Sequence, residues 1–542
     1  MIKRCDRWVW QRWISLFLLF VLTACTPSLG DRALGDGEAR GQTVVIGTTA
    51  RLRTLDPADA YEVLAGTLLY NLGDRLYTYK SGTTELIPQL ATALPEVSED
   101  GLTYRIPLRQ DVTFHDGTPF NAAAMVFSLK RFMESGGQPS ALLAGKIAEI
   151  RAIADYDLEL RLTQPFVALP ELLTFSGLCA VSPTAYGDQE TFLPTQFVGT
   201  GPFRLVYYGT DSIRLEPFQN YWGEPAQNPG VSIQIFSSSA NLYNSFRTGS
   251  IDIAAGALDP NQIKALSQQQ SDHPWREITG SGNIISVLSI NLRQPPWDQQ
   301  PARQALAASI NRQRLQERVF LGQAEPLYSL VPTIFPASQP DFQQYGPTTP
   351  ETAQRWTTQA GFSGDRPLVV NLWYRANVPS NVLAATVLKA SLERDLGDLV
   401  QVQLDSSESA TIYRNLDTGA YPLVLLDWYG DFFDPDNYLE PFLSCDAGSA
   451  TDGCTSGASF AWGSFFYSPE ANQLIDQSRT EADPDRRNAL FQALQQLNAE
   501  QVAFIPLWEN KNHLFAQENI EGLQLEVTQS FAFSTLSKQP TP

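Results

Sequence analysis

The second half of the chain alternates between strand-like and helix-like segments, and this alternation restricts the fold more than any other feature. After Arg366, strand patterns at 368–374, 400–404 and 421–428 are separated by a helical pattern at 380–396 and by a shorter one before the third strand. Strands that alternate with helices in this way form βαβ units. The sequence therefore predicts an α/β lobe with its own sheet.

The first half contains further strand and helix signals without any internal repeat. Residues 43–49 and 103–109 have the pattern of strands, and Asn121 is placed to cap a following helix. The apolar side chains of that helix recur with a helical period, at Met125, Val126, Leu129, Phe132 and Met133.

The first 24 residues have the pattern of an export signal. Four basic residues precede an apolar run at 14–21, which is shorter than a comfortable membrane span. The run ends in Leu-Thr-Ala-Cys, and small residues before a cysteine resemble the bacterial lipobox, in which Cys25 is lipidated and becomes the first residue. The alternatives are an uncleaved anchor and an ordinary signal peptide. Residues 25–42 are rich in glycine and charge, which predicts a flexible tether.

The charge of the chain argues against nucleic acid as a partner. The formal net charge is −20, and removal of residues 1–24, which carry four basic residues and one acidic residue, makes it −23. Such a surface repels phosphate groups and anionic lipid. We therefore expect the membrane connection to be the lipid on Cys25 and not a basic patch.

Three cysteines remain after Cys25. Cys445 and Cys454 flank a short polar loop, and an exported chain reaches an oxidising compartment, so we predict a disulfide between them, with two free thiols as the alternative. Cys179 lies among apolar residues and is interpreted as a buried packing residue.

One short stretch concentrates acidic and aromatic residues. DWYGDFFDPD, residues 427–436, places four carboxylates among four rings at the end of a predicted strand. Three interpretations are possible: a metal site, an acid/base pair, or an anionic pocket for a cation. The three histidines are scattered and no calcium-loop spacing is present, which argues against a metal. No GxSxG, HExxH, Walker or CxxC motif supports catalysis.

The third interpretation accounts best for the mixture of residues. A carboxylate beside Trp428 and Tyr429 would attract an ammonium group by charge and by cation–π contact. Ligands of open α/β sheets bind beyond the carboxyl ends of strands, where this stretch begins. We assign this role to Asp431, and we interpret Asp434 and Asp436 as turn residues.

Several segments resemble one known family in the same order along the chain. DWYGDFFDPDNYLEPFLS resembles a signature of the family 5 extracellular solute-binding proteins, which are the oligopeptide, dipeptide and nickel-complex receptors of ABC importers. Six further landmarks match: TLDPADAY (54–61), residues 86–131, VGTGPFRL (198–205), NYWG (220–223), residues 289–312 and AFIPLW (503–508).

The resemblance implies an α/β periplasmic-binding-protein clamp of two lobes with a two-stranded hinge near 284–291 and 503–508. The implied division is a signal peptide at 1–24, a tether at 25–42, lobe I at 43–283 with an extra domain at about 70–184, lobe II at 284–502, and a return to lobe I at 503–542. Trp428, Tyr429, Gly430 and Asp431 fit the W-x-x-D motif in which the aspartate of peptide-binding members receives a terminal ammonium.

The resemblance also implies a function. We expect the binding component of an ABC importer that captures oligopeptides or dipeptides and delivers them to a permease and its ATPase, with no catalysis, cofactor or metal. We expect a monomer on the periplasmic side of the cell envelope, held by its lipid. The alternatives are a receptor for another cargo of this family, such as a nickel chelate, a sugar or an opine, and a secreted hydrolase.

Overall fold

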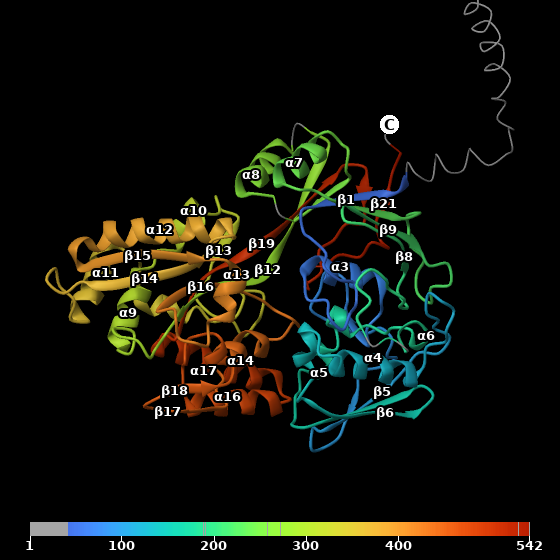
Figure 1. Cartoon of the computed structure of the whole chain (residues 1–542), viewed down its shortest axis with the longest axis horizontal. Coiled ribbons are helices and arrows are strands. Elements are labelled where there is room, and N and C mark those ends of the chain that lie inside the picture. Colours follow the sequence, from blue (N-terminus) through green and yellow to red (C-terminus); the bar gives the residue numbers. More distant parts are fainter. Residues whose placement is uncertain are drawn as a thin grey trace, which may run out of the picture.

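The computed structural model describes residues 42–540 except positions 188, 190, 257, 271, 272 and 529. Its main element is an 11-stranded mixed sheet that extends across the molecule (Figure 1). The spatial order of ten strands is β15 (Val400–Ser407), β14 (Leu368–Arg375), β16 (Leu423–Tyr429), β12 (Trp275–Ile290), β19 (Phe504–Gln517), β11 (Ile253–Ala255), β1 (Val44–Thr48), β10 (Val231–Ile235), β9 (Ser212–Pro217) and β8 (Phe203–Tyr208). The eleventh, β13 (Ala324–Pro326), pairs with β19.

The part of the molecule around β14, shown on the left of Figure 1, confirms the predicted βαβ pattern. β14 pairs in parallel with both β15 and β16, whereas β16 pairs antiparallel with β12. We call this part the β14 half. Its helices are α9 (Gln300–Ser309), α10 (Arg312–Arg318), α11 (Pro350–Gln359), α12 (Pro379–Leu396), α13 (Ser409–Arg414), α14 (Asp436–Leu443), α15 (Ala458–Ala461), α16 (Pro469–Thr480) and α17 (Pro484–Gln501).

The part around β1, on the right of Figure 1, is called the β1 half. Its helices are α3 (Val63–Leu72), α4 (Ala122–Glu134), α5 (Leu169–Leu172), α6 (Pro183–Tyr186), α7 (Ser239–Arg247) and α8 (Pro260–Gln269). A separate antiparallel sheet has the order β4 (Glu96–Val97), β5 (Thr103–Pro107), β7 (Asp157–Leu162) and β6 (Ile147–Ala154). Two short antiparallel pairs are formed by β2 (Tyr77–Tyr79) with β3 (Leu86–Pro88), and by β20 (Ile520–Glu521) with β21 (Ser537–Lys538).

Helix α4 forms as the sequence predicts. The side chain of Asn121 accepts a hydrogen bond from the backbone N–H of Ala124 (2.9 Å), which satisfies one of the free donors at the start of the helix. Met125, Leu129 and Phe132 are buried in the core that α4 shares with the separate sheet.

The two halves are joined through the long antiparallel pair β12 and β19. Their pairing is interrupted between Ser281 and Ile285. A Cβ atom on Gly282 would lie 1.4 Å from the carbonyl oxygen of Asn510, so only glycine allows this close approach of the two backbones. The main sheet therefore contains a local irregularity at the junction of its two halves.

Cys445 and Cys454 form a disulfide with a Cα–Cα distance of 5.7 Å, which confirms that prediction. The bond closes the hairpin of β17 (Ala447–Ser449) and β18 (Gly453–Ser456). Cys179 is buried and burial raises the pKa of its thiol to about 12, in agreement with a packing role. Among residues 42–540, apart from the positions left out, none of the helices has the length and apolar character needed to cross a membrane.

Candidate functional site

A pocket of about 710 Å³ lies between the β1 half and the β14 half. Nine aromatic residues line it together with a small number of polar groups, which is the usual composition of a small-molecule site. The lining residues are Ala60, Tyr61, Glu62, Val63, Gly66, Tyr70, Gln138, Thr174, Phe175, Ser176, Asn283, Tyr413, Asp427, Trp428, Tyr429, Gly430, Asp431, Phe432, Phe433, Trp462, Thr528 and Ser530. All four residues that the sequence assigns to ligand binding are therefore in one pocket.

Strand β16 ends at Tyr429, and the next residues, Gly430 and Asp431, line the pocket. A Cβ atom at position 430 would lie 2.3 Å from the hydroxyl oxygen of Tyr438. That hydroxyl donates a hydrogen bond to the carbonyl oxygen of Asn283 (2.7 Å) and cannot move without losing it. Gly430 is thus required by close packing, and it places Asp431 directly after the carboxyl end of the strand.

Asp431 is half-buried, and its backbone N–H donates to the side-chain oxygen of Asn437 (2.8 Å). Burial raises the pKa of its carboxyl group to about 6, although hydrogen bonds from Tyr61 and Asn437 and the charge of Lys146 act in the opposite direction. Burial of a carboxylate without a paired cation has this effect because the charged form loses its hydration.

Asp427, the first acidic residue of the stretch, forms an ion pair with Arg375, which the sequence did not predict. Arg375 donates to one carboxylate oxygen of Asp427, and the hydroxyl of Ser286 donates to the other (2.5 Å). The same guanidinium donates to Asn381 (3.0 Å) and to the hydroxyl of Tyr413 (3.0 Å). Arg375 ends β14, which is adjacent to β16 in the sheet, so only the strand order could have indicated the pair.

Asp434 and Asp436 are more than turn residues, and the interpretation from sequence was incomplete. The turn is present, since Asp434 accepts from the backbone N–H of Asp436 (2.9 Å). Both carboxylates are also buried and form two-bond ion pairs with arginines. Arg487 contacts Asp434 at 2.6 and 2.8 Å, and Arg479 contacts Asp436 at 3.0 Å through both bonds.

Three of the four carboxylates are therefore neutralised by arginine. Within the part of the chain that the structure describes, Asp431 is the only one of the four without an arginine or lysine at ion-pair distance. It is also the carboxylate that faces both the pocket and the hydroxyl of Tyr61 from the opposite half. The charge available for a ligand is thus concentrated on this side chain.

The aromatic walls are fixed by packing. The indole N–H of Trp428 donates to the carbonyl oxygen of Asn437 (2.7 Å), and its ring meets Trp462 edge to face with centroids 5.4 Å apart. Tyr429 is partly buried, and burial raises the pKa of its hydroxyl to about 12. Trp428, Tyr429 and Trp462 therefore present rigid ring surfaces to the pocket.

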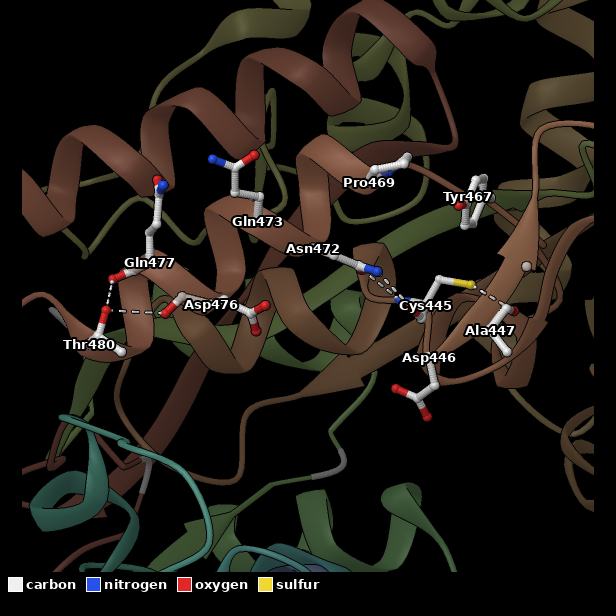
Figure 2. A pocket seen from close by; sticks show the side chains of 11 residues that line it. Cys445, Asp446, Ala447, Tyr467, Pro469, Asn472, Gln473, Asp476, Gln477 and Thr480 are labelled. Carbon is white, nitrogen blue, oxygen red and sulfur yellow. Dashed lines mark hydrogen bonds between the residues drawn. The ribbon is translucent and has the colours of Figure 1, made fainter. Parts of the chain in front are cut away.

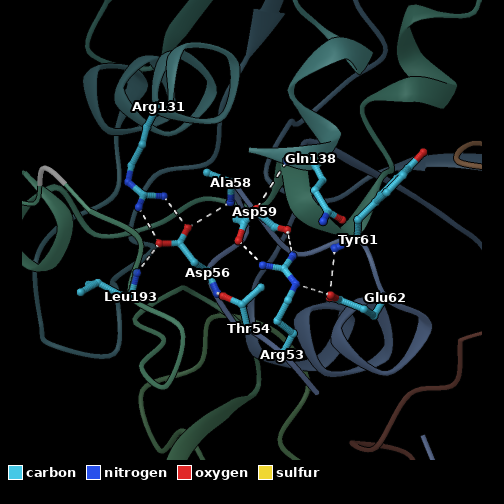
Figure 3. A network of polar contacts seen from close by, with 10 residues as sticks. All are labelled: Arg53, Thr54, Asp56, Ala58, Asp59, Tyr61, Glu62, Arg131, Gln138 and Leu193. Atoms are coloured by element: carbon cyan, nitrogen blue, oxygen red, sulfur yellow. Dashed lines mark hydrogen bonds and ion pairs between the residues drawn. The ribbon is translucent and has the colours of Figure 1, made fainter. Parts of the chain in front are cut away.

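The loop that carries Tyr61 belongs to the TLDPADAY landmark and is held by two ion-pair clusters (Figure 3). Arg131 binds both carboxylate oxygens of buried Asp56 at 2.7 and 2.6 Å. Arg53 binds Asp59 and Glu62, the latter at 2.6 Å. In Figure 3 the ring of Tyr61 points away from both clusters. This landmark thus positions Tyr61, whose role the sequence did not reveal.

The two halves also touch beside the pocket. Phe432 is buried in the core of the β1 half and meets Phe166 edge to face at 6.1 Å, and Phe433 meets Tyr79 at 5.7 Å. The backbone N–H of Val167 donates to the carbonyl oxygen of Arg479 (3.0 Å). The DFFDP sequence therefore contributes Asp431 to the pocket and its two phenylalanines to the contact between halves.

A second hollow, of about 760 Å³, lies on the surface beside the disulfide (Figure 2). Polar side chains of α16 line one side, and Asn472 exchanges hydrogen bonds with the backbone of Cys445 (2.6 and 3.0 Å). Two carboxylates, Asp446 and Asp476, line it, but Tyr467 is the single aromatic residue among its described lining residues, so it lacks the aromatic walls of the pocket between the halves. Among the described residues, no group of three or more His, Cys, Asp or Glu side chains is arranged to hold a metal ion.

The raised pKa of Asp431 predicts a pH dependence of cation binding. Between pH 7 and pH 5 the empty pocket takes up a proton on Asp431, and the protonated form has no charge for an ammonium group. We expect Kd for a free-amine peptide to rise about tenfold over this interval, because the pKa is about 6. Calorimetric titration at both pH values checks this. The Asp431→Asn variant serves as the control and loses the dependence, whereas an unchanged Kd for the wild-type protein contradicts the assignment.

Known proteins resemble the chain over most of its length. It is 26% identical to the peptide transport periplasmic protein SapA of Salmonella typhimurium over 548 residues, covering 95% of each chain. It is 28% identical to a dipeptide-binding protein of Escherichia coli over 463 residues, covering 80% of this chain and 82% of the other.

Solved structures have the same fold. HbpA2 from Haemophilus parasuis superimposes with a TM-score of 0.79 at 21% identity, over 92% of this chain and all of the other. A dipeptide-binding protein from Pseudoalteromonas, solved with Met-Leu, gives a TM-score of 0.76 at 21% identity, also over 92% of this chain and all of the other. These likenesses confirm the α/β periplasmic-binding-protein fold.

A family model matches the central two thirds of the sequence. The model for bacterial extracellular solute-binding proteins, family 5 Middle, covers residues 85–450, which include the separate sheet, the irregularity between the halves and the whole acidic stretch. The members of this family bind solutes and are not enzymes. The chain belongs to the family 5 bacterial extracellular solute-binding proteins.

Proposed function

We propose that the protein is the binding component of an ABC importer and that it captures a short peptide by its free amino terminus. The observation that carries this proposal is Asp431, a carboxylate without a paired basic residue in an aromatic pocket between two halves. An ammonium group would restore the charge balance there and could lie against the ring of Trp428. The names of the relatives support a peptide as the solute, since they include a peptide transport protein and a dipeptide-binding protein.

The fold suggests how capture is coupled to delivery. We propose lobe boundaries at 43–283, with an extra domain at about 70–184, at 284–502, and at 503–542. The irregular pairing between Ser281 and Ile285 would serve as the hinge. Tyr61 and Phe166 already lie against the DFFDP segment, so opening about this hinge would separate them and admit the ligand, and closure would enclose the ligand and create a surface for a permease.

The identity of the solute can be tested directly. The purified protein is freed of bound ligand by reversible unfolding, incubated with a mixture of di- to pentapeptides and examined by native mass spectrometry. We expect intact peptides to be retained, with a strong preference over their N-acetylated forms. Cleavage products would indicate a hydrolase, and retention of only sugars or metal chelates would assign a different cargo.

We also propose that the protein is a monomer attached to a membrane on the periplasmic side by lipid on Cys25. This residue lies outside the described part of the chain, so the proposal rests on the Leu-Thr-Ala-Cys sequence after a basic and an apolar segment. Cys25→Ser is expected to release the protein into the soluble fraction or to leave the precursor uncleaved. Membrane fractionation and mass spectrometry check this. A variant that is processed, acylated elsewhere and still membrane-bound contradicts it.

A further inference from the structure

The pocket between the halves contains acidic side chains but no basic ones. Its charged lining residues are Glu62, Asp427 and Asp431, and none of the described lining residues is lysine, arginine or histidine. Glu62 is paired with Arg53 at 2.6 Å, and Asp427 is paired with Arg375. One unbalanced negative charge, on Asp431, therefore remains.

Arg375 contacts two lining residues, Tyr413 and Asp427, and each of its nitrogen atoms already has an acceptor. Arg375 is 7% exposed, and its nitrogen atoms donate to Asn381, Tyr413 and Asp427. A ligand carboxylate would have to displace Asp427 from this guanidinium, leaving Asp427 without a cation.

The lysine whose charge acts on Asp431 is not among the residues that line the pocket. Burial lowers the pKa of this lysine, Lys146, and the charges of Glu440, Asp436 and Asp431 act in the opposite direction. Arg53 lies at the surface and already binds Asp59 and Glu62 (Figure 3). The pocket therefore offers a receptor for the positive end of a ligand and none for a negative end.

Enclosure of an unpaired carboxylate is costly, since it loses its hydration without gaining a partner. The ring faces of the wall make this cost larger, because their negative electrostatic potential favours cations and disfavours anions. An apolar side chain or an ammonium group, by contrast, fits such a wall.

We propose that the site is selective for ligands whose enclosed part is positively charged, so that it accepts an amino-terminal ammonium group but not a carboxylate in the same pocket. The application of this selectivity to peptides rests on the proposed function. It predicts that dipeptides bind better as carboxy-terminal amides than as free acids, and that longer peptides bind with the carboxylate outside the pocket.

The probes are Phe-Leu, Phe-Leu amide, N-acetyl-Phe-Leu and 2-phenylethylamine, each titrated calorimetrically into the purified protein at pH 7.5. We expect the amide to bind at least about tenfold more tightly than the free acid, and the acetylated acid to bind at least about thirtyfold more weakly than the free acid. Free acid that binds as well as the amide, or better, overturns the selectivity but leaves peptide capture intact. Binding of 2-phenylethylamine alone supports the selectivity and contradicts the peptide function, and binding of none contradicts both.

A substitution tests whether the pairing of Arg375 with Asp427 prevents the pocket from binding a carboxylate. Asp427→Asn removes the charge that occupies Arg375, so it should make this guanidinium available to a ligand carboxylate. The ratio of amide to acid affinity is expected to fall at least about tenfold in this variant. Asp436→Asn is the matched control, because it releases an arginine, Arg479, that does not line the pocket, and the ratio should stay within about threefold. An unchanged ratio in a folded Asp427→Asn variant overturns the role assigned to the Arg375 pair.

Discussion

Replacement of Asp431 by asparagine is expected to weaken binding of a free-amine peptide at least about thirtyfold. The asparagine keeps the shape of the side chain, but the enclosed ammonium group then faces only a neutral amide. Truncation of one member of a buried charge pair typically costs about 2 to 5 kcal/mol, and 2 kcal/mol corresponds to the thirtyfold limit. Calorimetry at pH 7.5 measures the effect in a range where Asp431, with a pKa of about 6, is ionised.

Asp434→Asn and Asp436→Asn are the controls for this substitution. Each removes the same charge from the same segment, but these side chains bind Arg487 and Arg479 and do not line the pocket. We expect both to change affinity by less than about threefold, with a loss of stability instead. Comparable affinity losses in all three variants would show that the segment acts through its fold and not through a specific charge.

Arg487→Gln is expected to lower the free energy of unfolding by about 3 to 5 kcal/mol, because removal of one partner leaves a buried charge without compensation. Asp434 is 4% exposed, and Arg487 holds both of its oxygens. Asp434 also faces Glu171, whose pKa burial and this negative charge raise to about 7, so loss of the arginine brings together two uncompensated carboxyl groups.

Denaturant unfolding followed by circular dichroism measures this loss. Lys80→Gln is the matched control, because Lys80 and Glu85 also form an ion pair, at 3.1 Å, but both side chains are about 60% exposed. Exposed pairs contribute less than about 1 kcal/mol. If the two variants lose the same stability, the buried pair has no special role in the fold.

The secondary structure of the β14 half was predictable because its signals are local. The predicted helix at 380–396 is α12, Pro379–Leu396, and the predicted strands at 368–374, 400–404 and 421–428 differ from the observed strands by at most three residues at an end. Apolar periodicity and strand length determine such elements within a short window. The antiparallel pairing of β16 with β12 was not predictable in the same way, since it depends on the order of strands in the sheet.

The part of the candidate site that is local in sequence was predictable, and the part formed by distant residues was not. Asp431 and its aromatic neighbours lie within four residues of one another, so their mixture was visible in the sequence. Their partners are distant: Tyr61 lies on the opposite half, and Arg375 lies on another strand. For Asp434 the local turn chemistry was correct, but its arginine is 53 residues away, and no sequence pattern indicates which arginine a buried carboxylate will contact.

The central claim, that Asp431 holds the amino terminus of the ligand, is tested most directly by a double-mutant cycle. Calorimetry gives Kd for wild-type protein and Asp431→Asn, each with a free-amine peptide and with its N-acetylated form at pH 7.5. Both changes remove the same interaction from opposite sides. We predict that acetylation weakens binding to the wild-type protein at least about thirtyfold but adds little further loss in the variant. If Asp431→Asn weakens both peptides equally, Asp431 does not bind the ammonium group.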